Sequence, residues 1–366
     1  MRWLLLLLVV LLLPSPAAAA ASRSAPEFNG SVYAIAKRGS VVYVGGTFTV
    51  AVSGGRTYKR ERLAAFDGRT GALLSWAPKA DRTVRALAVA GASVYAGGDF
   101  AQVSGRKRDN LARLDASTGA VGAFTHHVSG APYALAAAGG RLYVGGSFTA
   151  VDDRRRDNLA AFSLATDALD AGWRPRAEDA VHAVVAYGSK IYLGGTFEQL
   201  SGVARTARIG AVSATTGAVD AGFRPGSAAQ VNALAVDASG VYGATGGQGG
   251  RALAWTTAGR LRWQRLFDGD ATAIASVGGV TYVGGHFDRA CLTLANGTHG
   301  TCTGASTPRV KLAAVSATGA LTKWSPQANG VIGVRVLVPA PGGVYAGGDF
   351  TTMSGSTRRR FASLAF

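Results

Sequence analysis

The sequence is short of cysteine, of histidine and of negative charge, and each shortage limits what the protein can be. It has two cysteines and five histidines in 366 residues, so a metal site at the cysteines would lack ligands. The sequence carries 21 acidic residues against 38 lysines and arginines, which gives a formal net charge of +17. Such a charge favours anionic partners without identifying one.

Linear motifs of catalysis are also missing. There is no nucleophile elbow, no His-Glu-x-x-His, no phosphate-binding loop and no calcium-loop spacing. None of the histidines has a motif around it; they are His126, His127, His182, His286 and His299. We therefore predict no catalytic residue, no cofactor and no metal site, although dispersed loop residues could still form an enzyme site, with His182 or His286 as its acid or base.

The only long apolar run lies at the N-terminus. Arg2 precedes an apolar stretch from Trp3 to Leu13, and prolines and the small residues Ala17 to Ala21 follow it. This pattern is typical of a secretory signal peptide, and its core of about a dozen residues is short for a bilayer span. We predict a signal peptide at residues 1–21 and a secreted, extracellular chain without a membrane span. An uncleaved anchor is the alternative.

What the sequence does contain is one motif many times. Tyr-Val-Gly-Gly stands at Tyr43 to Gly46 and at Tyr143 to Gly146. Variants bring the total to seven, at a spacing of roughly 50 residues and with similar apolar residues on both sides, so the chain reads as one supersecondary unit repeated seven times. The other copies begin at Tyr95, Tyr192, Tyr242, Tyr282 and Tyr345, and the units are numbered one to seven in chain order.

Each unit contains four short apolar runs separated by turn residues. In unit two these are Val84 to Val89, Ser93 to Gly98, Leu111 to Asp115 and a last segment with Phe124, which we read as strands A to D. Thr118-Gly119 and its equivalents predict a tight turn between strands C and D. Small sheets that cannot bury both faces alone pack radially, so we predict an all-β, seven-bladed β-propeller with four-stranded blades.

The two ends of the chain suggest how such a ring closes. The chain stops at Phe366, inside strand C of unit seven, while residues Ala25 to Gly30 precede the first strand A without a partner. Phe28 is expected to take the place of the recurring aromatic residue. We predict that this N-terminal strand completes the last blade, so that residues 22–366 form one domain.

The repeat resembles a known family. Tyr-Val-Gly-Gly-x-Phe, then Gly-x-x-Arg before Leu-Ala, then Thr-Gly and an aromatic residue before proline, is similar to the delta-60 repeats of exported bacterial β-propellers. The resemblance implies a propeller outside the cytoplasm, for most members without an assigned activity. A fainter similarity is to quinoprotein dehydrogenase repeats, because Ala65 to Gly71 precede Trp76. That spacing is one or two residues too long, and the chain has neither a vicinal cysteine pair nor a haem-attachment motif.

Cys291 and Cys302 lie together in the long loop between strands B and C of unit six. In an exported protein the simplest reading is a disulfide, which closes a loop of about 12 residues. Free thiols and a metal site with His299 are the alternatives.

The second residue of each strand A marks a candidate site. The neighbouring positions stay apolar, but this one is mostly polar and differs from unit to unit, as expected of a position that faces water or a ligand at the mouth of the central channel. These residues are Tyr33, Arg85, Tyr133, His182, Asn232, Thr272 and Arg335.

The residue after Gly-Gly forms a second ring. Its members are Thr47, Asp99, Ser147, Thr196, Gln248, His286 and Asp349. Because the two arginines and the two aspartates of these rings fall in the same units, we predict structural ion pairs Arg85–Asp99 and Arg335–Asp349. The remaining set suits a sugar or a peptide, with water-filled channel lining as the alternative: Tyr33, Tyr133, His182, Asn232, Gln248, Thr272 and His286.

Two neighbouring loops sharpen this hypothesis. Unit five has a short loop at Gln248 to Arg251, and unit six has the longest loop, Asp288 to Lys311. We predict a binding cleft between them, near Asn232, Gln248, Thr272 and His286.

The loops between strands B and C are rich in arginine. The arginine three residues before strand C is regular enough for a structural role, namely to cap carbonyl groups or to pair with a neighbouring blade; it occurs at Arg60, Arg108, Arg156, Arg309 and Arg358. Its neighbours should make one face basic. A nucleic-acid partner would need interleaved aromatic residues, and only Tyr58 is present, so we expect none.

Together these patterns predict a secreted, monomeric, non-catalytic propeller. We expect an anionic wall polymer, a glycan or a protein to bind its loop face. The alternative is an enzyme at the channel mouth, either a hydrolase or lyase or a quinone-linked dehydrogenase.

Overall fold

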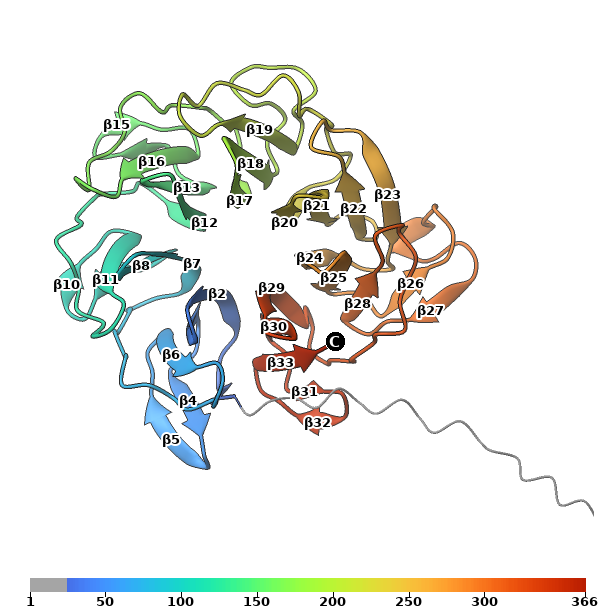
Figure 1. Ribbon diagram of the computed structural model, residues 1–366, viewed down its shortest axis with the longest axis horizontal. Coiled ribbons are helices and arrows are strands. Elements are labelled where there is room, and N and C mark those ends of the chain that lie inside the picture. Colours follow the sequence, from blue (N-terminus) through green and yellow to red (C-terminus); the bar gives the residue numbers. More distant parts are fainter. Residues whose placement is uncertain (1–24) are drawn as a thin grey trace, which may run out of the picture.

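The computed structural model describes residues 25–366, and this part of the chain is all-β apart from one 3-10 turn, η1 (Thr298–Gly300). The predicted signal peptide lies outside the described residues. Sheets are arranged radially around a centre, as Figure 1 shows, and each copy of the tyrosine-glycine motif lies on the middle strand of a separate sheet. The innermost strands contact one another in cyclic order, and the last of them contacts the first.

Strands A, B and C form as predicted in all units, and each sheet pairs them in the order A-B-C. The inner strands are β2 (Val32–Arg38), β7 (Val84–Ala90), β12 (Ala131–Ala138), β17 (Val181–Tyr187), β20 (Val231–Asp237), β24 (Ala271–Val277) and β29 (Val334–Ala340). The middle strands are β3 (Val41–Gly46), β8 (Ser93–Gly98), β13 (Arg141–Ser147), β18 (Lys190–Gly195), β21 (Gly240–Thr245), β25 (Val280–Gly285) and β30 (Gly343–Gly348). The third strands are β6 (Leu63–Asp67), β11 (Leu111–Asp115), β16 (Leu159–Ser163), β19 (Ile209–Ser213), β22 (Arg251–Trp255), β28 (Leu312–Val315) and β33 (Phe361–Ala365).

The fourth strand differs from the prediction. Within residues 25–366 it is a regular strand in unit five alone, where β23 (Leu261–Leu266) pairs with β22. In five other units the chain makes one isolated bridge to strand C, for example between Phe66 and Leu73. In these five units the segment that we predicted as strand D therefore stays close to its sheet without forming a backbone ladder.

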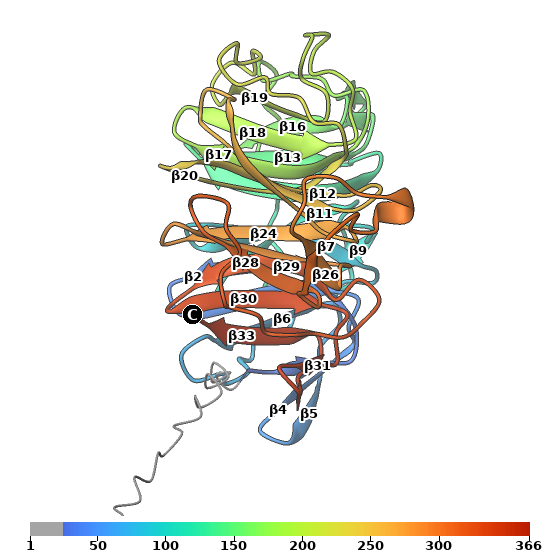
Figure 2. The ribbon, with the colours of Figure 1, turned by 90° about the vertical axis from the view of Figure 1, so that its right-hand side faces the viewer.

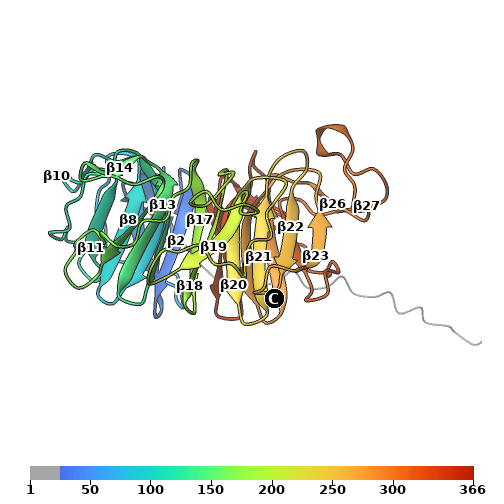
Figure 3. The same cartoon turned by 90° about the horizontal axis from the view of Figure 1, so that it is seen from above.

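The loops between strands B and C contain short hairpins that the sequence analysis did not identify. Figure 3 shows hairpins of this kind, including β26–β27, at the same face of the ring, and Figure 2 shows η1 projecting from that face. Several turn at two residues with positive φ, such as Ser104 and Gly105, whose φ values are 49° and 75°. They are β4 (Val50–Ser53) with β5 (Arg56–Lys59), β9 (Gln102–Val103) with β10 (Arg106–Lys107), β14 (Ala150–Val151) with β15 (Arg154–Arg155), β26 (Arg289–Cys291) with β27 (Ser306–Pro308), and β31 (Thr352–Met353) with β32 (Ser356–Thr357).

The Gly-Gly pair lets neighbouring segments approach each middle strand. A Cβ on Gly45 would lie 2.6 Å from the Val84 side chain of the next unit. A Cβ on Gly46 would lie 2.0 Å from the carbonyl oxygen of Ser31. Any larger residue would push apart two packed sheets or the chain entering strand A, which explains why both glycines recur.

The same contact occurs where the last unit meets the first. A Cβ on Gly347 would lie 2.7 Å from Val32, as its equivalents do elsewhere. Tyr43 donates a hydrogen bond to the Ala116 carbonyl of the next unit, and Tyr345 donates one of 3.3 Å to the Gly68 carbonyl of unit one. Side chains of both units share one apolar cluster. Units seven and one therefore pack like any other neighbouring pair.

The N-terminal segment does not complete the last sheet as predicted. β1 (Glu27–Phe28) pairs with β4 in the loop of unit one, and its only backbone hydrogen bond to unit seven runs from Phe28 to the Arg359 carbonyl, at 3.1 Å. Phe28 pairs with Ala51 as Ala80 pairs with Val103 in unit two. It is thus the equivalent of Ala80, four residues after the recurring aromatic position, which is why it does not pair with strand C.

Candidate ligand-binding channel

A cavity of about 560 Å³ lies along the inner strands. All seven residues of the first ring line it, followed by a layer of small residues such as Ala34 and Ala86 and a layer of branched residues such as Ile35 and Leu87. The structure thus brings together the seven positions that the sequence marked as variable. The cavity has a polar and aromatic layer above an apolar lining.

A β-bulge places each of these seven residues. In every inner strand the pairing register shifts at the second residue, so that Val32 and Ala34 have partners on β3 while Tyr33 between them has none. The same shift occurs in the other six inner strands. A bulge bends the strand and re-aims the unpaired side chain, here toward the cavity.

Aromatic and cationic side chains occupy one side of the ring. The Arg335 guanidinium carbon lies 5.0 Å from the centre of the Tyr33 ring, and that of Arg85 lies 5.4 Å from the Tyr133 ring. Tyr133 and His182 stack with centroids 5.5 Å apart and planes 7° apart. Units seven and one to four therefore present flat surfaces to the channel, against which a planar or ring-shaped ligand could pack.

The other side of the ring is already engaged by its neighbours. The Asn232 side-chain amide donates to the Ala271 carbonyl at 2.8 Å, and the Thr272 hydroxyl donates to the Val334 carbonyl at 2.6 Å. Both bonds join one inner strand to the next. These two predicted ligand residues thus contribute to packing between units, which leaves them fewer free donors.

The two arginine–aspartate pairs are not alike. Arg85 Nε lies 2.8 Å and 3.0 Å from the two carboxylate oxygens of Asp99. Arg335 and Asp349 come no closer than 3.9 Å, which is beyond hydrogen-bond length. Only the first pair is a hydrogen-bonded ion pair.

Burial and charge tune the titratable groups of the ring. The hydrogen bond and charge of Asp99 raise the pKa of Arg85 against the opposing effect of burial. Burial lowers the pKa of His182, with a smaller opposing effect from Asp179. His182 is therefore a neutral imidazole at neutral pH.

Gln248 and His286, which we grouped with the ring, do not line this cavity. Both are exposed. Where we predicted a cleft beside them, the unit-six loop packs onto the unit-five loop. Asn296 Nδ2 donates to the Phe267 carbonyl at 3.1 Å, and a Cβ on Gly300 would lie 2.4 Å from the backbone nitrogen of Gly249. The short loop thus makes room for the long one.

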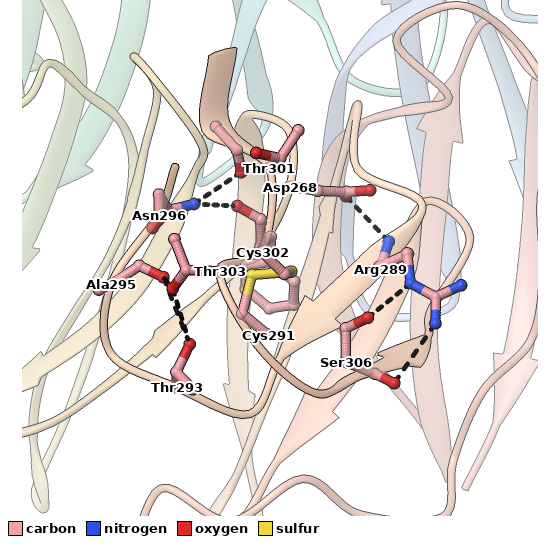
Figure 4. Close-up of a disulfide and its surroundings, with 12 residues drawn as sticks. Asp268, Arg289, Cys291, Thr293, Ala295, Asn296, Thr301, Cys302, Thr303 and Ser306 are labelled. Carbon is pink, nitrogen blue, oxygen red and sulfur yellow. Dashed lines mark hydrogen bonds between the residues drawn. A yellow bond between two sulfur atoms is a disulfide. The ribbon is translucent and has the colours of Figure 1, made fainter. Parts of the chain in front are cut away.

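The predicted disulfide joins Cys291 and Cys302 at the base of that long loop. Figure 4 shows it between Asn296, which also donates to the Gly300 carbonyl, and Arg289, which donates to Ser306. Cys291 is fully buried. The crosslink therefore supports the part of the loop that covers unit five.

The regular arginines act on the backbone, as expected. Arg60 donates to the carbonyl of the preceding residue and, at 2.8 Å, to the Leu74 carbonyl in the segment after strand C. Arg108, Arg156 and Arg309 make the same two kinds of bond. Unit four has the buried Thr206 at this position, whose hydroxyl accepts from Leu200 and donates to Val203. Because these arginines are hydrogen-bonded to the backbone, the positive charge expected on the loop face must come from the exposed lysines and arginines beside them.

Sequence reasoning missed His126. Its side chain is 12% exposed and lies between Phe124 and Phe162. One ring nitrogen lies 2.6 Å from the Asp152 carboxylate and the other 2.7 Å from the Asp167 carbonyl. His126 therefore joins units two and three. Nothing in the sequence around Asp152 or Asp167 indicated that these residues contact a histidine of the preceding unit.

Residues 25–366 lack two features that would point to other functions. No three histidine, cysteine or acidic side chains gather closely enough to hold a metal ion. No helix in that range has the length and apolar character needed to cross a membrane.

Comparisons with known proteins identify the fold. No protein-family profile and no curated protein matches the chain. Among solved structures, the WD40 β-propeller domain of Doa1 is similar with a TM-score of 0.58 at 11% identity, over 94% of this chain and 96% of that one. The computationally designed protein Ika8 gives 0.54 at 15%, over 95% and 100%. BamB from Moraxella catarrhalis gives 0.51 at 15%, over 91% and 93%. At such identities the likeness shows the fold alone, which is a β-propeller.

Proposed function

We propose that this chain is a secreted, non-catalytic β-propeller of seven blades, of the delta-60 repeat type, that binds an extracellular or cell-wall-associated ligand. The ligand is a glycan, a wall polymer or a protein segment, and it enters the channel from the face that carries the loops between strands B and C. The blade count rests on the seven sheets whose inner strands contact one another in cyclic order. The monomeric state is part of the same proposal.

The observation that carries the proposal is the ring of seven bulged residues around one cavity. Bulges at matching positions direct side chains of differing chemistry to a common space, while the rest of each inner strand stays apolar. A cavity of about 560 Å³ has the size of a small-molecule site. Its stacked Tyr133 and His182 offer the kind of flat surface on which a sugar ring packs.

A binding experiment with matched variants tests this function. Tyr133→Ala and His182→Ala remove the stacked pair and should weaken binding to soluble peptidoglycan fragments or to a glycan array at least about tenfold, the effect of 1.4 kcal/mol. Tyr187→Ala is the control, because Tyr187 is exposed at the opposite end of the strand that carries His182. Equal binding by all three variants would contradict a site in the channel.

One observation favours an enzyme as the second candidate. His182 is half-buried, burial lowers its pKa, and no described residue forms a hydrogen bond with its imidazole, so it could act as a general base. A turnover screen of the same glycans on the same sample separates the two functions. If product is released from these glycans and its release requires His182, the protein is a hydrolase or a lyase and not a binding protein alone.

A further inference from the structure

The two arginines of the channel differ in how fully their charge is compensated. In unit two both carboxylate oxygens of Asp99 accept from Arg85. In unit seven the carboxylate of Asp349 instead accepts from two backbone amides, those of Gly333 at 2.6 Å and Ile332 at 3.2 Å. Asp349 is therefore held by the backbone, and Arg335, 3.9 Å away, lacks the hydrogen bond to it that its repeat position predicts.

Glycines in the segment before strand A cause this difference. Gly330 and Gly333 have φ values of 100° and 73°, a conformation that other residues rarely adopt, and this turns the amides of Ile332 and Gly333 toward Asp349. The equivalent segment of unit two, Asp81 to Thr83, is two residues shorter than Asn329 to Gly333 and has no glycine. The carboxylate of Asp99 in unit two consequently accepts hydrogen bonds from Arg85.

Arg335 is thus a cation in the channel without a hydrogen-bonded counterion among residues 25–366. Its Nε is buried and has no hydrogen-bond partner, and its guanidinium packs against Tyr33. The side chain is 29% exposed and lines the cavity. A guanidinium presents a fork of donors that matches the two oxygens of a carboxylate or a phosphate, and stacking on an aromatic ring fixes its plane.

We propose that Arg335 is the anion-binding residue of the channel and that the ligand is a saccharide with a singly charged oxyanion, a carboxylate or a phosphodiester. The inference rests on the proposed function in that it takes the channel as the binding site. One negative charge fits because one guanidinium is available and the nearby Asp349 repels a second. Tyr33 and Tyr133 lie on the same side of the cavity and provide the surface for the sugar ring.

Calorimetric titration with three probes tests the inference. The probes are an oligoglucuronate, a neutral gluco-oligosaccharide of equal length and an oligosaccharide of equal length whose sugars are joined by phosphodiesters. The wild-type protein should bind one or both charged probes at least about tenfold more tightly than the neutral one, since a hydrogen bond to a charged group contributes that much. Comparison of the two charged probes distinguishes the carboxylate from the phosphodiester as the source of the oxyanion.

Three variants locate the charge. Arg335→Gln should lower the ratio of charged-probe to neutral-probe affinity to about one, whereas Arg85→Gln, the matched control, should change this ratio less than about threefold because Arg85 is already compensated by Asp99. Asp349→Asn should strengthen binding of the charged probe by removing a competing negative charge. An unchanged preference in Arg335→Gln, or an equal loss in Arg85→Gln, would overturn the inference.

A measurement on the wild-type protein makes the test independent of how the variants fold. Raising sodium chloride from about 0.05 M to 0.5 M should weaken binding of the charged probe and leave the neutral one unaffected. If neutral and charged probes bind equally and Tyr133→Ala weakens both, the anion site is wrong while the channel remains the binding site. If no probe binds the wild-type protein, the glycan form of the proposed function fails together with this inference.

Discussion

Units five and three build the outer edge of their sheets in different ways. In unit five β23 pairs with β22 at five positions, whereas in unit three a single bridge joins Phe162 to Leu169. Arg156 of unit three donates to the Asp170 carbonyl in the segment that leaves that bridge. A side chain thus satisfies a carbonyl group that a ladder would have used.

The residue two positions after the recurring tryptophan accounts for this contrast. Unit three has Pro175 there and unit five has Arg265. Proline has no N–H to donate to a ladder, which confines it to strand edges and turns. Unit four has Pro225 and the same single bridge without the arginine, so the proline is sufficient there. In unit two His126 stands at this position and makes its contacts through the imidazole.

The strongest test introduces the proline into unit five. Phe267 donates to the Gly250 carbonyl, and because antiparallel bonds alternate, the N–H of Arg265 should point at β22 as well. Arg265→Pro should lower the free energy of unfolding by about 1–3 kcal/mol, because the carbonyl of the buried, opposite Ala252 would lose its donor. Chemical denaturation measures this loss.

Two controls isolate the backbone effect. Arg265→Ala removes the side-chain bonds to Gly319 and Cys291 but keeps the N–H, so it gives the side-chain share of the loss. Pro175→Ala in unit three should cost less than about 1 kcal/mol, because it changes mainly the unfolded chain. If Arg265→Pro and Arg265→Ala were equally destabilising, the ladder would not be the reason for the contrast.

The tryptophans of the two units provide a smaller test. Trp173 donates its indole N–H to the Ser213 carbonyl of the next unit at 3.0 Å, whereas the buried indole nitrogen of Trp263 has no partner among the described residues. Trp173→Phe should therefore destabilise the protein by about 1 kcal/mol more than Trp263→Phe. Thermal unfolding of both variants measures the difference, and equal losses would argue against a role for the bond.

The smallest expected effect is that of acid on the turns between strands C and D. Low pH should weaken the turn of unit one and leave the turn of unit five unchanged. Asp67 of unit one accepts from the amides of Arg69 and Thr70 and from Ser40, and these bonds hold its pKa at about 2, against 3.8 ordinarily. In unit five Thr256 has no charge to lose. Because the folded-state pKa is lowered, the stabilisation is complete above about pH 4 and disappears as the pH falls through about 2.

Unfolding midpoints between pH 5 and pH 2 check this effect. Asp67→Ser, which copies the serine of unit three, should be less stable than the wild-type protein at pH 5, and the gap should narrow toward pH 2. A gap that stays constant would mean that the carboxylate charge contributes nothing to the turn.

Most of the frame could be predicted from the sequence, because it depends on local patterns that recur. Strands A to C follow from apolar runs, and glycines such as Gly71 and Gly119 have the predicted positive φ of 74° and 77°. Strand D was overpredicted because an aromatic residue in an apolar segment resembles a strand even where a proline blocks pairing. The loop hairpins were missed because strands such as Arg154–Arg155 are two polar residues long, although Ser-Gly turns marked several of them.

The candidate site was predictable in its members but not in its energetics. The seven ring positions could be read from their variation between units. The missing hydrogen bond between Arg335 and Asp349 could not be predicted, because it depends on two backbone amides in the segment that contains Gly330 and Gly333. Gln248 and His286 were misplaced because the residue after Gly-Gly does not line the cavity in any unit.

Because of the bulge in each inner strand, the residues that line the channel are not among those that pair with the middle strand. Tyr33 and its six equivalents have no partner in the register, so exchanging one of them leaves the hydrogen bonds of its strand in place. Selection, or an engineer, could therefore change the lining one unit at a time while the scaffold stays constant, except at Asn232 and Thr272, whose side chains donate to the next inner strand.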